Sequence, residues 1–389
     1  MRQALLWRAA GLLVVLGAVT QAQAAVMYRV VDLGTLGGTS STAYGINDLG
    51  QVVGAAFAQT PSGAALHAFR TAPNQPINPA TDDLGTLGGH SSVGWAINNH
   101  GQVVGGSWLP GSPSSHAFRT APNQPINPPT DDLGTLGGSM SQARGINDAG
   151  QVVGESRLAG DNISHAFRTG PNQAINPATD DLGASAGLSF SDAWAINEVG
   201  QVAGRSSVGA YRTGPNSAID PQTDVLGTLG GTRSGAYAIN ASGQVAGASE
   251  VALGSIRSHI FRTGPNQPIN PATDDLGTHG EDDPVVWGMN DRGDIVGMMF
   301  TAQGDNEYAF VCLGSTVFDL NDRIDPASGW TLLEAYDINN LGQIVGVGEH
   351  DGVRRAFRLD PIPEPSGLVI SMGGIGYVAL ARRQKRQRA

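Results

Sequence analysis

Three short motifs return in a fixed order along most of this chain, and that regularity constrains the fold more than any other feature. The motifs are of the types DLGTLGG, INxxGQVVG and HAFR, and each occurs seven times. The asparagine of the second motif recurs every 43 to 51 residues, at Asn47, Asn98, Asn147, Asn197, Asn240, Asn290 and Asn339. A period of this length indicates a repeat protein, in which each copy is one small unit that packs against the next.

One repeat contains four candidate strands. Residues 43–46 and 51–54 flank residues 47–50, where Asn, Asp and Gly favour a tight turn and so predict a hairpin. Residues 67–70 form the third candidate strand and residues 81–87 the fourth. Four short strands in a unit of this size are typical of a β-propeller blade.

The two ends of the repeat region are complementary. It begins with a strand of the fourth type, residues 28–33, and ends with a strand of the third type, residues 355–359. The first strand can therefore complete the last unit, which hides sheet edges that would otherwise invite aggregation. We expect an all-β fold over residues 25–360: a closed β-propeller of seven four-stranded blades. An open β-solenoid is the alternative, and it would need atypical capping ends.

The third motif carries a family resemblance. His-Ala-Phe is complete at residues 67–69, 116–118 and 165–167, and the four later copies keep only part of it. Together with the other two motifs, these copies resemble the HAF repeat of bacterial extracellular proteins over residues 28–359. The resemblance implies the repeat architecture and an extracellular location, and it specifies no activity.

The N-terminal segment has the pattern of a secretory signal peptide. Arg2 and Arg8 supply positive charge, residues 9–19 form a short apolar stretch, and Ala22 and Ala24 make a small-x-small cleavage site. The apolar stretch is too short for a stable membrane span. We expect a signal helix over residues 1–24, signal peptidase as a processing partner, and a mature chain that starts near Ala25.

The C-terminal segment, residues 361–389, has three parts. Pro363, Glu364 and Pro365 precede an uncharged apolar stretch at 366–381, which predicts a short transmembrane helix. A basic tail follows, made of Arg382, Arg383, Lys385, Arg386 and Arg388, which favours the cytoplasmic side. In this order the parts resemble the PEP-CTERM sorting signal of exported Gram-negative proteins. That resemblance implies cleavage at Pro-Glu-Pro by exosortase and transfer to the cell surface. A plain membrane anchor is the alternative.

Charge and cysteine content exclude some functions. The formal net charge is −11, and loss of the basic terminal segments would make the body more acidic still. Nucleic-acid binding needs basic patches, so it is not expected. The single cysteine, Cys312, cannot form an internal disulfide and lies in an apolar stretch, which predicts a buried strand residue.

Histidines and acids recur at fixed places in the repeats. Since the third strand lies outside the centre of a propeller, hydrogen bonding is a better interpretation than a shared metal for His67, His116, His165 and His259. Turn preference explains the acids at Asp48, Asp148, Glu198 and Asp291 and the asparagines that replace them at Asn99 and Asn340, but not Ala241. Acid pairs precede the fourth strand at Asp82–Asp83, Asp131–Asp132, Asp180–Asp181 and Asp274–Asp275. We expect these pairs to be solvated turn acids, with weak calcium binding as the alternative.

No sequence feature predicts catalysis. A Gly-x-Ser-x-Gly elbow, a His-Glu-x-x-His helix and a P-loop are all absent, so we expect neither an enzyme nor a cofactor. The acids found in one repeat only are the exception, and Glu281, Asp282 and Asp305 around one pocket would favour a polysaccharide lyase or glycosidase. We expect an exported, inner-membrane-anchored precursor that reaches the cell surface or extracellular matrix. There it would bind polysaccharide or protein; a calcium-stiffened structural protein is a further alternative.

Overall fold

The structure is a computed structural model that describes residues 26–60, 63–255, 257–280, 282–301 and 306–363. It is all-β, and its only helices in these ranges are single turns: α1 (Pro128–Asp131), η1 (Ala184–Ala186), η2 (Leu320–Arg323) and η3 (Pro326–Ser328). None of the helices described is long and apolar enough to cross a membrane. The predicted signal helix at 1–24 and transmembrane helix at 366–381 lie outside the described residues.

The strands form seven separate antiparallel sheets, one for each repeat. The first strands are β2 (Gly37–Ile46), β5 (Ser92–Ile97), β8 (Gly137–Ile146), β11 (Ser191–Ile196), β14 (Ser234–Ile239), β18 (Asp283–Met289) and β22 (Trp330–Ile338). The second strands are β3 (Val52–Thr60), β6 (Val103–Trp108), β9 (Val152–Leu158), β12 (Val202–Ser206), β15 (Val245–Glu250), β19 (Ile295–Phe300) and β23 (Ile344–His350). The third strands are β4 (Gly63–Arg70), β7 (Ser115–Arg119), β10 (Ser164–Arg168), β13 (Gly209–Arg212), β16 (Ser258–Arg262), β20 (Glu307–Leu313) and β24 (Val353–Ile362).

The fourth strands are fewer than expected. Within the described ranges, only three sheets have one: β1 (Met27–Asp32), β17 (Asp275–Gly277) and β21 (Thr316–Asp319). In the other four sheets the fourth segment makes a single bridge, such as that between Phe69 and Asp83. The prediction of seven four-stranded units is therefore wrong for these sheets. A turn before the bridge explains the shortening, because the N–H groups of Thr81 and Asp82 both bond back to the carbonyl of Asn78 and leave little extended backbone to pair. β17 follows the same kind of turn and is only three residues long.

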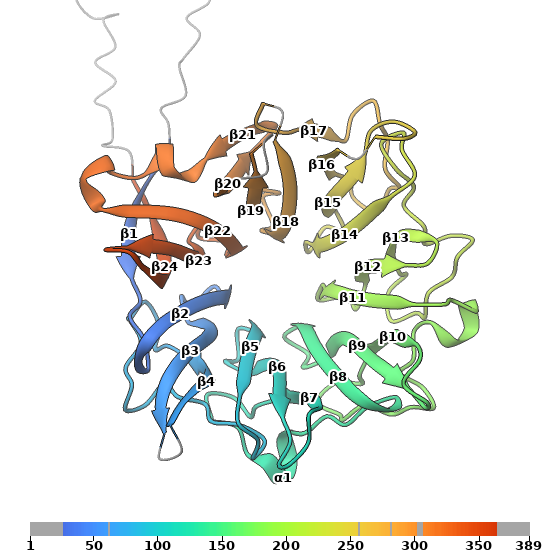
Figure 1. Cartoon of the computed structure of the whole chain (residues 1–389). Helices are drawn as coiled ribbons and strands as arrows, with labels where there is room; N and C mark the ends of the chain where they lie inside the picture. Colours follow the sequence, from blue (N-terminus) through green and yellow to red (C-terminus); the bar gives the residue numbers. More distant parts are fainter. Residues whose placement is uncertain (1–25, 61–62, 256, 281, 302–305, 364–389) are drawn as a thin grey trace, which may run out of the picture. The chain divides into compact units, whose positions relative to one another are not determined.

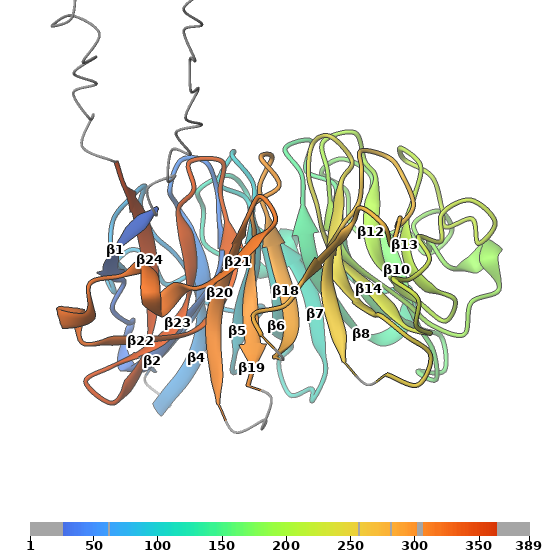
Figure 2. The ribbon, with the colours of Figure 1, turned by 90° about the horizontal axis from the view of Figure 1, so that it is seen from above.

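The seven sheets lie around a common centre, and the first strand of each is nearest to it (Figure 1). Figure 2, turned by 90°, shows the connecting loops gathered at two opposite faces. Each first strand ends in the Asn-x-x-Gly turn of the second motif, where Gly50, for example, has a φ of 77°. The turns between first and second strands therefore lie at one face, and the loops between second and third strands at the other.

The first strand of the chain completes the last sheet, as predicted. β1 pairs with β24 in antiparallel register from Met27↔Ile362 to Asp32↔Phe357. Tyr28 is buried in the core of this sheet, and Arg29 forms an ion pair with Asp360 at 2.9 Å. The two ends of the repeat region are thus held in one sheet.

The core is built from the aromatic residue of the third motif. Phe69 and its six equivalents are fully buried, at the third strand of every sheet. The glycine of the second motif makes room for them: a Cβ on Gly54 would collide with the Phe69 ring and with the Thr42 carbonyl oxygen. The hydroxyl of Ser41 joins neighbouring sheets, because it accepts from the N–H of Ala356 at 3.0 Å and donates to the carbonyl of Gly34.

Candidate functional site

A β-bulge interrupts every first strand at the same position. In β2 the register shifts between Ala43 and Gly45, so Tyr44 is the extra residue. The equivalent bulges lie in the other six first strands. A bulge re-aims a side chain relative to the sheet. The seven extra residues, called here the central ring, are Tyr44, Trp95, Arg144, Trp194, Tyr237, Trp287 and Tyr336.

The residues of the central ring contact one another in a closed series. Tyr44 packs against Trp95 with ring centroids 4.3 Å apart, and against Tyr336 at 4.8 Å. The series continues through Trp194, Tyr237 and Trp287 at centroid distances of 5.5 to 6.3 Å. Aromatic pairs at such distances attract one another beyond the area that they bury.

Arg144 is the one member of the central ring that is not aromatic. Its guanidinium carbon lies 4.7 Å from the ring centroid of Trp95 and 4.8 Å from that of Trp194, which is cation–π geometry on both sides. Arg205, from the neighbouring β12, lies 5.8 Å from Trp194. One side of the central ring is therefore cationic and the other purely aromatic.

The central ring encloses a cavity of about 200 Å³, called here the aromatic cavity. All seven of its lining residues are only partly buried, so their side chains remain partly accessible. Every sheet contributes one of them. A cavity of apolar ring surfaces with a few polar groups is the usual form of a small-molecule site.

Polar groups beside the central ring are held by hydrogen bonds. The Tyr336 hydroxyl donates to Glu334 at 2.6 Å, and the Trp194 indole N–H donates to Asp192 at 3.0 Å. Burial raises the pKa of the Glu334 carboxyl, and the hydrogen bond from Tyr336 opposes this. The buried indole N–H of Trp287, in contrast, has no hydrogen-bond partner among the described residues.

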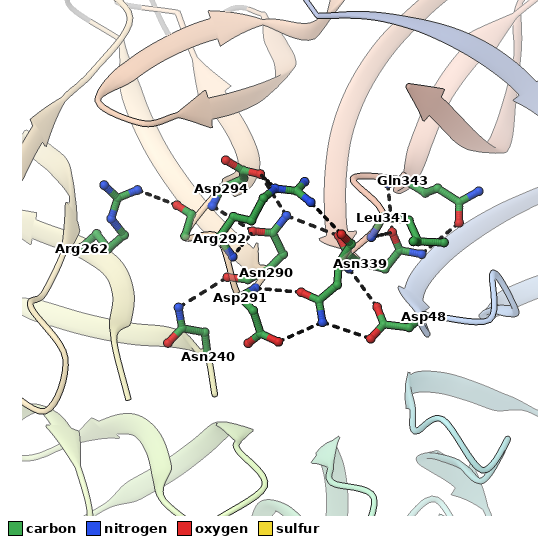
Figure 3. Close-up of polar contacts among 12 residues, drawn as sticks. Asp48, Asn240, Arg262, Asn290, Asp291, Arg292, Asp294, Asn339, Leu341 and Gln343 are labelled. Atoms are coloured by element: carbon green, nitrogen blue, oxygen red, sulfur yellow. Dashed lines mark hydrogen bonds and ion pairs between the residues drawn. The ribbon is translucent and has the colours of Figure 1, made fainter. Parts of the chain in front are cut away.

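A second set of residues, the asparagine circuit, surrounds the same centre. Each of its asparagines lies three residues after a residue of the central ring, just past the end of the first strand. Asn47 donates from its side-chain amide to the carbonyl of Asn98, and Asn98 does the same to Asn147. The series passes through all seven repeats and returns from Asn339 to Asn47 (Figure 3 shows part of it). The side-chain oxygen of Asn47 also accepts from the N–H groups of Leu49 and Gln51, which explains the spacing of the second motif.

The predicted turn acids lie next to the asparagine circuit and connect neighbouring sheets. Asp48, labelled in Figure 3, accepts from the N–H of Asn340. Asp291 accepts from the N–H of Ala241. Turn preference alone therefore does not explain them. Burial raises the pKa of Glu198, and the carboxylates of Asp148 and Asp291 add to the effect. These acids and the circuit border a polar cavity of about 260 Å³.

The repeated histidines are hydrogen-bonded, as predicted. The Nδ1 atom of His67 lies 3.0 Å from the carboxylate of Asp83, and His116, His165 and His259 make the same contact in their own repeats. Burial raises the pKa of Asp83, but hydrogen bonds from His67 and Gly85 outweigh it and lower the pKa overall. These pairs tie the third strand to the segment that follows it.

The prediction that the acid pairs are solvated is wrong for their first members. Asp82 is only 6% exposed and accepts hydrogen bonds from the N–H of Asn78 and the hydroxyl of Thr81. Its equivalents, Asp131, Asp180 and Asp274, are buried in the same way. The short loop before the fourth segment needs an internal acceptor, because its N–H groups would otherwise be buried without a partner.

The remaining candidate residues are Cys312 and the acids found in one repeat only. Cys312 is fully buried, as predicted, and burial raises its pKa to about 11. Asp282 accepts from the hydroxyl of Tyr308, whereas Glu281 and Asp305 lie outside the described residues. In the described part of the chain, no group of three His, Cys, Asp or Glu side chains is placed to hold a metal ion.

The processing motifs fall mostly beyond the described part of the chain. Of the sorting motif only Pro363 is described, as the residue that follows β24. The cleavage site, the rest of the sorting motif and the basic tail lie outside it: Ala22, Ala24, Glu364, Pro365, Arg382, Arg383, Lys385, Arg386 and Arg388.

Sequence reasoning missed the central ring. Its signal was present, since the residue three before each repeated asparagine is aromatic or arginine in all seven repeats and small residues mostly flank it. Neither a family model nor a curated protein matches this chain.

Proposed function

We propose that residues 27–362 form a seven-bladed β-propeller with a ligand site at its centre. The support is threefold: seven sheets surround one centre, β1 completes the sheet of β22, β23 and β24, and the asparagine circuit returns to its start. An open solenoid would leave its first and last units far apart, whereas Asn339 and Asn47 are hydrogen-bonded.

The chain is an exported, non-catalytic binding protein that is sorted to the cell surface or extracellular matrix. The sequence supports this through the signal-peptide pattern at 1–24, the HAF-type repeats and the PEP-CTERM-like segment at 361–389. Signal peptidase and exosortase are its processing partners, and the inner membrane holds the precursor through residues 366–381.

Its ligand is an extracellular polysaccharide, and the observation that carries this is the central ring. A sugar ring has faces made of C–H groups and an edge of hydroxyls, so it fits a cavity of aromatic surfaces with a few polar groups. A cavity of about 200 Å³ is smaller than the ~300 Å³ at which drug-sized pockets begin, so it suits one sugar unit better than a folded protein segment.

Binding is tested with the full-length chain in detergent and a panel of polysaccharide fragments, by calorimetry. Fragments that bind the unchanged protein should bind Trp95→Ala at least tenfold more weakly, because stacking on an aromatic face is lost. Leu341→Ala, at an exposed position outside the ring, is the matched control and should bind normally. The absence of binding to any fragment would remove the proposal.

The non-catalytic assignment has its own test. Each bound fragment is incubated with the protein and its mass measured over a day. Unchanged mass is expected. Shortened or unsaturated products would instead identify a glycosidase or lyase.

Sorting is tested by the intact mass of the protein recovered from cells with and without the sorting protease. A chain that starts near Ala25 and ends near Pro363 only when the protease is present is expected. An uncleaved C-terminus in both strains would identify a plain membrane anchor.

A further inference from the structure

The charges around the central ring are uneven. Arg144, in the third sheet, and Arg205, in the fourth, both flank Trp194. Every sheet except the third places Tyr or Trp in the central ring. Of the seven residues that line the aromatic cavity, Arg144 alone is charged, so a ligand there meets positive charge on one side only. This asymmetry is informative about ligand chemistry, because a neutral sugar needs no such charge.

The two arginines differ in how completely they are paired. Arg205 donates from two nitrogens to Asp192, at 2.6 and 3.4 Å, so its charge is largely balanced. Arg144 makes one ion pair among the described residues, with Glu155 at 3.5 Å, the limit of a hydrogen bond. Its side chain is 18% exposed and lines the aromatic cavity. Arg144 thus retains N–H donors beyond those that Glu155 occupies.

A guanidinium with spare donors in a fixed position suits a planar anion. Its fork matches a carboxylate with two parallel hydrogen bonds, which a lysine or a neutral donor cannot reproduce. Trp95 and Trp194 hold the fork from both sides, so little side-chain entropy remains to be lost on binding. A quaternary ammonium, the other common guest of aromatic cages, is disfavoured, because two arginines already lie beside the rings.

We propose that the aromatic cavity binds one carboxylate-bearing sugar unit, a uronic acid, with its carboxylate on Arg144 and its ring among the aromatic side chains. This inference rests on the proposed binding of polysaccharide and specifies the class of sugar. The cavity volume of about 200 Å³ admits a single unit, so a polymer is recognised at its end.

The direction of entry follows from the same charges. Asp48, Asp148, Glu198 and Asp291 lie beside the asparagine circuit, four residues after the ring residues and so at most about 13 Å from them along the chain at ~3.3 Å per strand residue. Their charges repel an anionic chain at that end. Asp192 and Glu334 lie on the opposite side of the ring, but Asp192 is paired with Arg205 and Glu334 accepts from the Tyr336 hydroxyl. The acidic sugar therefore enters from that side, toward the loops between second and third strands.

The experiment uses the full-length chain and three trimers, of galacturonic, glucuronic and mannuronic acid, each beside its neutral methyl ester. Calorimetry should show at least one acid bound tenfold or more tightly than its ester. Arg144→Gln should reduce that preference to less than threefold. Arg144→Lys, which keeps the charge without the fork, should retain an intermediate preference. Arg233→Gln removes the same charge at an exposed position outside the central ring and serves as the control with unchanged preference.

The outcomes separate this inference from the function on which it rests. Equal binding of acid and ester, or an unchanged preference in folded Arg144→Gln, would overturn the uronic-acid site while leaving polysaccharide binding intact. Binding of no trimer while neutral fragments bind would overturn it too, and binding of nothing would remove both. If an acid is preferred, its free monosaccharide distinguishes the source: equal affinity for monomer and trimer indicates a free sugar acid, and tighter binding of the trimer indicates a polymer end.

Discussion

The side-chain amide of Asn339 donates a hydrogen bond of 3.0 Å to the carbonyl oxygen of Asn47, 292 positions earlier in the chain. The equivalent bond joins each of the other pairs of neighbouring repeats. The bond between Asn339 and Asn47 lies at the seam, which is the junction between the last sheet and the first. Further contacts hold that seam, among them the pairing of β1 with β24 and the bond from Ala356 to Ser41. The seam is thus built like the junctions within the chain, with one additional strand.

Replacement of Asn339 should open this seam. Asn339→Ala removes the donor to Asn47 and the acceptor for the N–H groups of Leu341 and Gln343, in a buried site. Buried groups left without partners cost about 1–3 kcal/mol each, so the free energy of unfolding should fall by about 2–4 kcal/mol. Urea denaturation measures this. Leu341→Ala, exposed in the same turn, should change the free energy by less than about 0.5 kcal/mol, and an equal loss in both variants would contradict the explanation.

Adjacent glycines in β6 provide a matched pair. A Cβ on Gly105 would collide with the carbonyl of Val93 and lie 3.0 Å from the Phe118 ring, whereas a Cβ on Gly106 would meet only Gln142, at 3.7 Å. Gly105→Ala should therefore destabilise the protein by about 1–3 kcal/mol through overpacking. Gly106→Ala should be neutral or stabilising by up to about 1 kcal/mol. Thermal unfolding compares the two, and similar melting temperatures would show that the packing at Phe118 is looser than described.

The repeat period and its ends were sufficient to predict much of the fold. Seven sheets, the Asn-x-x-Gly hairpins and the completion of the last sheet by the first strand all follow from motif order and spacing. Most fourth strands did not follow, because the residues just before the Asp-Leu-Gly segment form a turn, in which the N–H of Asp82 bonds to the carbonyl of Asn78 and the Asp82 side chain accepts from the N–H of Asn78. Such a local bond competes with strand pairing and is not visible in an apolar pattern.

The central ring was harder to predict for a geometric reason. In a regular strand, the alternation of faces would give Tyr44 the same environment as the residues two positions away. The bulge at Tyr44 breaks that alternation, and nothing in the residues around it distinguishes a bulge from a continuous strand. Only the comparison of all seven repeats at this position, with their large side chains between mostly small neighbours, signals a shared role.

Asp337 gives the seam a pH dependence. Its carboxylate accepts from the N–H groups of Ile46 and Ile338, and burial raises its pKa to about 6 against those bonds. The folded state therefore binds this proton more tightly than the unfolded chain. The resulting stability is fully present below about pH 4 and is lost as the pH rises through 6.

Asp337→Asn should remove this part of the pH dependence. Between pH 4.5 and 7.5 the unchanged protein should lose on the order of 2 kcal/mol more stability than the variant, from a shift of about two units. Other carboxyls with raised pKa, such as Glu334, keep their contribution in both proteins. Denaturation at several pH values gives the slopes. Asp351→Asn, at an exposed turn, is the control, and its stability should vary with pH as that of the unchanged protein does. If the stability of Asp337→Asn varied with pH in the same way too, the role of the Asp337 carboxyl would be refuted.

Two tryptophans of the central ring should respond oppositely to the same substitution. The buried indole N–H of Trp287 has no partner among the described residues, whereas that of Trp194 donates to Asp192 at 3.0 Å. Trp287→Phe removes an unsatisfied donor and keeps an aromatic face, so the free energy of unfolding should stay level or rise by about 1 kcal/mol. Trp194→Phe leaves Asp192 with Arg205 but without its indole donor, and should cost about 1–2 kcal/mol. Urea denaturation measures the free energy of unfolding of both variants. A loss in Trp287→Phe as large as in Trp194→Phe would mean that indole volume, and not hydrogen bonding, governs the stability of the ring.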